Sequence, residues 1–165
     1  MSIKKDLAKI AVQEERLQFQ DFDADTAWKL GNRLKANAET RGVAVTIEIR
    51  VGKETVFFFA MQGVNPSNAD WARRKRNVVD LLWRSSCAVG LSLQEEQSSL
   101  EAKMGLPLRD YTAHGGSFPI RVVGVGTIGT VTVSGLPQRD DHAMLVEELA
   151  GMLGVPLSEV ALPQA

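Results

Sequence analysis

Lys75 is the side chain whose position most needs a chemical explanation. It lies within the run Arg73-Arg74-Lys75-Arg76, on a segment whose apolar residues recur at helical spacing. At about 100° per residue, Lys75 falls inside the apolar stripe that contains Trp71 and Val78. A lysine that points inward must extend to water, pair with a carboxylate or bind an anionic ligand. Lys75 is therefore a candidate ligand-binding or catalytic residue, with a structural ion pair as the alternative.

The three arginines around Lys75 suggest nucleic-acid binding only at first sight. Their side chains point in different directions around a helix, which is typical of solvated faces and surface ion pairs. The chain has 19 Lys and Arg against 20 Asp and Glu, a net charge of -1. It therefore lacks the general positive field of nucleic-acid-binding proteins. We expect no nucleic-acid partner and keep Arg74, beside Lys75, as a candidate anion-binding residue.

The turn His114-Gly115-Gly116 is the second candidate site. Paired glycines let the backbone approach a ligand closely and can present N–H groups to an anion, and the imidazole can donate, accept or titrate. A tight turn with an exposed histidine is the alternative.

His142 shares a helix face with Leu145 and should point inward near a helix N-terminus. It is either a further ligand-binding residue or a hydrogen-bonded core histidine.

Cysteine and histidine counts limit the metal and redox chemistry. Cys87 is the single cysteine, so the chain cannot form an internal disulfide, and with two histidines it cannot assemble a zinc site of Cys and His pairs. No nearby residue marks Cys87 as an activated thiol. We expect no metal site and a structural role for Cys87.

The run Gly124-Val125-Gly126-Thr127-Ile128-Gly129 matches the G-x-G-x-x-G fingerprint of dinucleotide-binding proteins. That turn must follow a strand and open a helix, so that helical N–H groups face the pyrophosphate. The residues after Gly126 are β-branched and read as a strand. We therefore reject nicotinamide or flavin binding through this turn.

The elements that position these residues follow from periodicity and from turn and capping residues. Helices are expected from Ile3 to Leu17, from the carboxylates at 21–25 to Gly42, from Ser67 or Asn68 to about Val89 with Gly90 as terminator, over Ser99–Met104, and from Asp140 or Asp141 to Gly154. Strands are expected over Val43–Val51 and Thr55–Met61, and over Phe118–Val123 and Thr127–Ser134, as two hairpins.

The order of these elements favours an α+β fold: an antiparallel sheet flanked by helices, in the order helix-helix-strand-strand-helix-strand-strand-helix. The length of 165 residues suits one domain spanning 1–165. The longest apolar run, Val56–Met61, is far shorter than the roughly 20 residues that cross a bilayer, and no signal peptide is visible. We expect a cytoplasmic protein without a membrane partner.

Three segments resemble the haem-degrading HbpS-like (GlcG/HbpS) family, and within it a branch of small, largely uncharacterised conserved proteins of this length. They are Asn68-Ala69-Asp70-Trp71-Ala72-Arg73-Arg74-Lys75-Arg76-Asn77-Val78, His114-Gly115-Gly116-Ser117-Phe118-Pro119-Ile120 and Gly126-Thr127-Ile128-Gly129-Thr130-Val131-Thr132-Val133-Ser134-Gly135-Leu136-Pro137. The resemblance implies a profilin-like sheet, assembly into homo-oligomers and, by analogy with some relatives, haem as a cofactor. No haem-attachment motif is present, and spacing selects no iron ligand.

Three functions follow as hypotheses. The first is a small-ligand-binding domain that takes haem or another anionic metabolite through Lys75, His114 and the glycine-rich turns. The second is a non-catalytic oligomeric adaptor that binds another protein. The third is an enzyme that acts on small carbonyl or carboxylate substrates with Lys75 or His114 as acid, base or nucleophile. An enzyme needs converging groups in one pocket, whereas an adaptor should display an exposed apolar patch with a charged rim.

Overall fold

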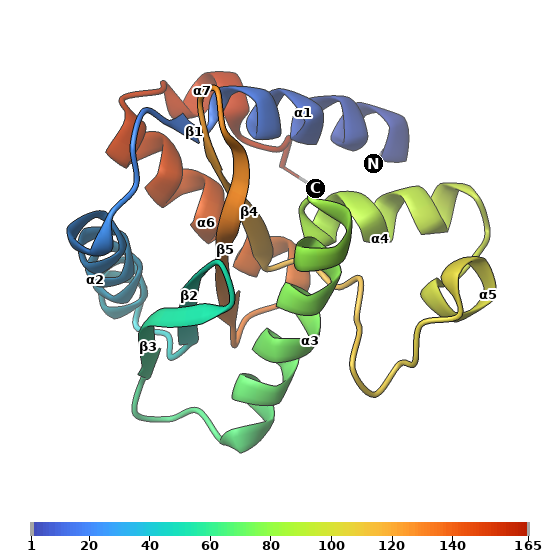
Figure 1. Cartoon of the computed structure of the whole chain (residues 1–165), viewed down its shortest axis with the longest axis horizontal. Helices are drawn as coiled ribbons and strands as arrows, with labels where there is room; N and C mark the ends of the chain where they lie inside the picture. The colour runs from blue at the N-terminus through green and yellow to red at the C-terminus, as the bar shows by residue number, and fades with distance from the viewer. Residues whose placement is uncertain (1, 165) are drawn as a thin grey trace.

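The computed structural model describes residues 2–164 (Figure 1). Its helices are α1 (Ile3–Arg16), α2 (Ala24–Arg41), α3 (Pro66–Leu82), α4 (Ser86–Glu95), α5 (Leu100–Met104), α6 (Gln138–Leu153) and α7 (Leu157–Val160). Its strands are β1 (Gln18–Phe19), β2 (Thr46–Val51), β3 (Glu54–Ala60), β4 (Ser117–Val122) and β5 (Gly126–Ser134).

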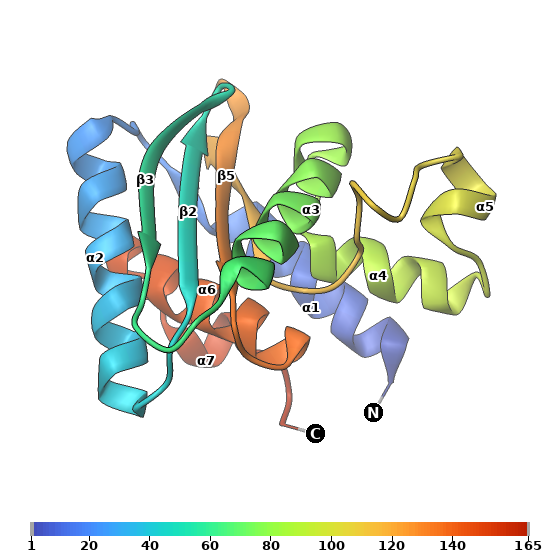
Figure 2. The same ribbon diagram turned by 90° about the horizontal axis from the view of Figure 1, so that it is seen from below.

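The five strands form one sheet in the order β1-β4-β5-β2-β3. The pairs β2–β3 and β4–β5 are antiparallel hairpins, and the antiparallel pair β5–β2 joins them at the centre, with Thr46 opposite Ser134. Figure 2 shows β3, β2 and β5 side by side. The expected α+β fold is confirmed, and Thr127 lies in β5, not at the start of a helix. The short strand β1 was not expected, and it pairs with β4 in parallel.

One face of the sheet carries the main hydrophobic core. Ile47 of β2 and Val133 of β5 pair with each other and are fully buried against α2 and α6, which contribute Leu30 and Leu145 to the same cluster. Figure 1 shows these two helices on one side of the sheet and α3 on the other. This packing fixes the sheet and therefore the two loops that leave its end toward α3 and α6.

The opposite face of the sheet is polar although it is buried. Residues that pair across neighbouring strands point to the same side of the sheet, and successive residues along one strand point to opposite sides. The opposite face therefore carries the residues that neighbour Ile47 and Val133 in the sequence, and their partners on the other strands. Its residues, each less than a tenth exposed, are Thr46, Glu48, Ser117, Thr130, Thr132 and Ser134. Helix α3 covers them, and its Arg76 lies 2.8 Å from Glu48 in an ion pair. The helix that carries Lys75 therefore rests on a polar surface.

The expected long helix from Asn68 to Val89 is wrong, because α3 ends at Leu82 and a second helix, α4, begins at Ser86. Trp83 has a left-handed backbone with φ of 55°, and Ser85 then caps α4 by accepting a hydrogen bond from the Ala88 N–H at 3.2 Å. The buried Glu14 carboxylate of α1 accepts a bond from the Ser85 N–H at 2.7 Å. Gly90 does not end a helix either. It lies inside α4, where a Cβ would collide with the Ala113 carbonyl.

Other helix boundaries differ by a few residues. Asn65, and not Ser67 or Asn68, is the N-cap of α3, and Asn68 completes a capping box with it. Helix α6 begins at Gln138, before the expected Asp140. Over residues 2–164, no helix is both long and apolar enough to span a bilayer.

Candidate functional site

Three segments converge at one end of the sheet around a small polar pocket, which we call the lysine pocket. They are the N-terminal half of α3, the loop before β4, and the end of β5 with the turn that leads into the first residues of α6. The pocket has a volume of about 210 Å³. It is lined by Asn68, Trp71, Lys75, His114, Ser134, Gly135, Leu136, Gln138 and Asp141. Lys75 and His114, both selected from the sequence, therefore share one pocket.

A buried ion pair forms the floor of the lysine pocket. Lys75 Nζ lies 2.8 Å from Asp141 Oδ2, and the two side chains are 5% and 1% exposed. The ammonium also donates to the Val133 carbonyl at 3.3 Å, and Asp141 accepts from the Leu136 N–H at 3.0 Å. Burial raises the pKa of the Asp141 carboxyl, while Lys75 opposes that rise. The pair ties α3 to α6, and the bond from the Leu136 N–H adds the β5–α6 turn.

Gly116 makes room for this ion pair. Its φ of +127° is rarely adopted by residues with a side chain. A Cβ at this position would lie 2.6 Å from the Val133 carbonyl and 2.8 Å from Lys75 Nζ. The backbone is thus packed directly against the ammonium group. Gly115 is also constrained, since its N–H donates to Gln138 Oε1 at 3.0 Å.

Planar groups stack along the outer wall of the lysine pocket. The His114 and Trp71 rings are parallel within 14°, with centroids 5.1 Å apart, and the Arg74 guanidinium lies 4.4 Å from the Trp71 ring centre. Burial, together with the charges of Lys75 and Arg74, lowers the pKa of His114 below its ordinary value. The imidazole is therefore neutral at pH 7 and keeps a lone pair for a ligand or a metal.

The lysine pocket offers hydrogen-bond donors, while the side-chain oxygens of its two amides are already used. The Asn68 Oδ1 atom accepts from the Asn65 N–H, and Gln138 Oε1 accepts from the Gly115 N–H, so both amide NH₂ groups are identified by these bonds. Within residues 2–164, neither NH₂ group has an acceptor, and the Lys75 ammonium has acceptors for two of its three N–H bonds. A molecule that pairs with these donors would accept hydrogen bonds from them.

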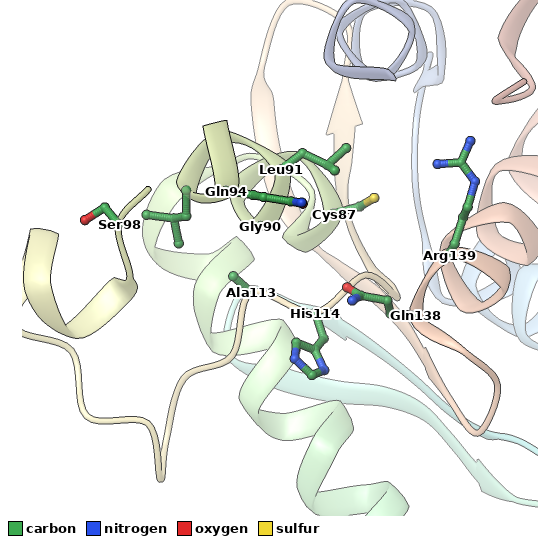
Figure 3. Close-up of a pocket in the computed structure, with 10 residues that line it drawn as sticks. Cys87, Gly90, Leu91, Gln94, Ser98, Ala113, His114, Gln138 and Arg139 are labelled. Atoms are coloured by element: carbon green, nitrogen blue, oxygen red, sulfur yellow. The ribbon is translucent and has the colours of Figure 1, made fainter. Parts of the chain in front are cut away.

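A second pocket, the α4 pocket, adjoins the lysine pocket and shares His114 and Gln138 with it (Figure 3). Its volume is about 410 Å³. Its other lining residues are Cys87, Gly90, Leu91, Leu93, Gln94, Ser98, Ala113 and Arg139. The Arg139 charge is balanced by Asp6, 2.8 Å away, and burial raises the pKa of the Cys87 thiol to about 11. The α4 pocket is thus largely apolar, with a neutral thiol.

His142 does not join the other candidate residues. It lines neither pocket and lies fully buried on α6, facing α1, where Nε2 is 2.8 Å from Gln13 Oε1. Gln13 donates its own NH₂ group to the Val160 carbonyl at 2.7 Å, so His142 Nε2 carries the proton in this bond. Burial lowers the pKa of His142 to about 4. The structure supports the core-histidine interpretation.

Arg74 supports the site and does not line it, because its Nε donates to the Leu108 carbonyl at 3.0 Å. Within residues 2–164, no three His, Cys, Asp or Glu side chains gather as a metal site.

Sequence reasoning missed Asp141, Asn68 and Gln138 as pocket residues. One signal pointed to Asp141: an inward-pointing Lys75 needs a partner such as a carboxylate. That signal did not identify which carboxylate in the chain is the partner.

The family model described as haem degrading protein HbpS-like matches residues 22–150. A UPF0303 protein of Azotobacter vinelandii is 60% identical over 162 residues, which cover 98% of each chain. A UPF0303 protein of Paraburkholderia phymatum is 52% identical over 165 residues and covers both chains completely.

Solved structures show the same fold at low sequence identity. The Ybr137w protein superposes with a TM-score of 0.84 at 24% identity, covering 90% of this chain and 87% of that one. HbpS superposes with a TM-score of 0.65 at 19% identity, covering 83% and 93%. A PduOC:Heme complex gives a TM-score of 0.65 at 15% identity, covering 75% and 89%.

Proposed function

Since the chain belongs to the family described as haem degrading protein HbpS-like, we propose that it binds a small ligand and that this ligand is an anion held at Lys75. The observation that carries this proposal is the hydrogen-bonding character of the lysine pocket. Lys75, Asn68 and Gln138 present N–H groups to it. The side-chain oxygens of Asn68, Gln138 and Asp141 already accept hydrogen bonds from the protein. Ionised carboxylates accept hydrogen bonds and donate none, and the unprotonated oxygens of a phosphate group do the same. A carboxylate or phosphate therefore complements the pocket.

Haem is the first ligand to test, because it carries carboxylates and because PduOC, a structural neighbour, was solved as a haem complex. The residues present fit it in one respect, since His114 is neutral and borders the largely apolar α4 pocket. In bound haem, His114 would supply an imidazole to the iron, and Lys75 would meet a propionate. Haem would bring redox chemistry at the iron.

The test of the proposal must separate ligand binding from folding. Lys75→Met alone leaves Asp141 buried without its partner, so we pair it with Lys75→Met/Asp141→Asn, in which the asparagine keeps an acceptor for the Leu136 N–H. Lys53→Met, at an exposed position outside both pockets, is the control. Titration with haemin and with succinate should show saturable binding to wild type and to the control.

The double variant should bind about 10- to 100-fold more weakly, the range for losing a charge-assisted hydrogen bond. A change in melting temperature with unaltered affinity would assign Lys75 a structural role only. Absence of saturable binding to wild type would contradict the proposal and favour the adaptor hypothesis.

We also propose that the chain assembles with copies of itself. Trp28 and Trp83 are 64% and 61% exposed, and aromatic residues are enriched in protein–protein interfaces. Burial of these indoles between subunits would remove them from water. Analytical ultracentrifugation should therefore show a species heavier than the 18.0 kDa chain, and a monomer alone at micromolar concentration would contradict this proposal.

A further inference from the structure

The lysine pocket is too small to hold a complete metabolite of ordinary size. Its volume of about 210 Å³ lies below the roughly 300–1,000 Å³ that is typical of small-molecule sites. Its lining donors suit one anionic group. A ligand of ordinary size that places its anionic group here would therefore extend outside the lysine pocket.

The α4 pocket is the neighbouring space, and its chemistry is complementary. Its volume of about 410 Å³ falls within the typical range, and Leu91, Leu93 and Ala113 give it apolar walls. Cys87 adds a neutral thiol, which behaves as a small apolar group. The one charged side chain among its lining residues, Arg139, donates to Asp6 at 2.8 Å and to the Pro163 carbonyl at 2.7 Å. The α4 pocket thus suits an uncharged, apolar group.

The two pockets meet at a short wall. His114 and Gln138 line both of them, and the bond from the Gly115 N–H to Gln138 Oε1 holds the two sides of this wall together. Figure 3 shows His114 and Gln138 near each other, with Cys87 and Leu91 projecting from α4. A ligand that passes this wall would contact donors at one end and apolar side chains at the other.

We propose that the ligand is an amphiphilic carboxylate, whose carboxylate is bound in the lysine pocket and whose apolar body lies in the α4 pocket. This inference rests on the proposed anion-binding function and adds the chemical class of the rest of the ligand. It also explains the two chemically different pockets on either side of His114, one rich in donors and one without a free charge.

The test is a series of straight-chain carboxylates, from butyrate through hexanoate and octanoate to decanoate, titrated into the full-length protein below their micelle concentrations. Each methylene group that enters the α4 pocket should tighten binding about three- to fourfold. Trp71 lines the lysine pocket and stacks on His114, so its fluorescence provides a readout.

Two variants locate the apolar body. Leu91→Gln places an amide in the α4 pocket and should weaken decanoate binding about tenfold while leaving butyrate binding unchanged. Leu7→Gln is the matched control, because Leu7 packs on the same buried cluster as Leu91 but does not line the α4 pocket. The control should preserve the dependence on chain length. If Leu91→Gln does not fold, the wild-type series still decides.

The outcomes distinguish this inference from the proposed function. Binding that depends on Lys75 but does not strengthen with chain length would overturn the amphiphilic class and leave the anion site intact. Binding that strengthens with chain length equally in wild type and Leu91→Gln would overturn the assignment to the α4 pocket. No saturable binding of any carboxylate, haemin or succinate would overturn both proposals.

Discussion

The stability of the protein should depend strongly on the ion pair between Lys75 and Asp141. The two side chains are 5% and 1% exposed and their charged atoms lie 2.8 Å apart, so solvent screens the interaction little. Replacing Lys75 by Met leaves a buried carboxylate whose remaining hydrogen-bond partners are the backbone N–H groups of Gly135 and Leu136. Breaking a buried pair in this way typically destabilises a protein by about 3–5 kcal/mol. We expect a loss of that size at pH 7.

The second change, Asp141→Asn, tests whether the loss comes from the unpaired charge. The asparagine oxygen can still accept from the Leu136 N–H, and with Met at position 75 no buried charge remains. The double variant should therefore be more stable than the sum of the single effects predicts, by about 1–3 kcal/mol. Urea unfolding followed by circular dichroism gives all four free energies, and similar m-values would show that the unfolding transitions are comparable.

The pH dependence of Lys75→Met supplies an independent check. Without the ammonium, burial raises the pKa of Asp141 further, so the folded protein binds a proton more readily than the unfolded chain, whose value is 3.8. The stability attached to this group is present at low pH and is lost as pH rises through the folded-state pKa. Lys75→Met should thus regain stability relative to wild type on acidification. The buried pair would be refuted if Lys75→Met and Asp141→Asn each lowered the free energy of unfolding by less than about 1 kcal/mol, if the two effects were additive, and if Lys75→Met regained no stability at low pH.

Three further predictions concern other buried groups. The pKa of His142 is about 4 in the folded state against 6.5 in the unfolded chain. The free energy of unfolding should therefore fall by about 3 kcal/mol as pH drops from 6.5 to 4. His142→Gln should lose this dependence when unfolding is measured over the same pH range. Gly116→Ala should destabilise by about 1–3 kcal/mol more than Gly126→Ala in thermal unfolding, since both glycines have positive φ but only Gly116 is crowded; equal effects would contradict the crowding. Cys87, with its pKa near 11, should react with a thiol reagent at pH 8 far more slowly in the native protein than in urea, and equal rates would show an exposed thiol.

Local sequence signals predicted the fold well where the structure is local. The hairpins follow from alternating β-branched residues around glycine turns, and Gly42 and Gly154 end α2 and α6 in left-handed conformations. The break at Trp83 was missed because a bulky residue adopts a conformation that glycine usually signals, although Ser85 was an available N-cap. Strand β1 has two residues, too few to show any periodicity.

The candidate site was predictable only in part, for a related reason. Helical periodicity placed Lys75 inward, but its partner Asp141 is 66 positions away in the chain, and no spacing rule connects residues across that distance. His142 was misleading because inward orientation alone does not say which layer a residue joins. The donor character of Asn68 and Gln138 depends on backbone N–H groups that capture their oxygens, a property of the folded loops and not of residue type.

The central pairing of β2 with β5 has a consequence for how the chain folds. Each hairpin closes within a few residues, whereas Thr46 meets Ser134 only after roughly ninety intervening residues have been brought back. Loop closure over such a distance is entropically unfavourable and slows the formation of non-local sheets. The two hairpins should form early and independently, and their union should be the slow step. Until that step, the edges of β2 and β5 stay unpaired and open to intermolecular pairing, so refolding yield should fall as protein concentration rises.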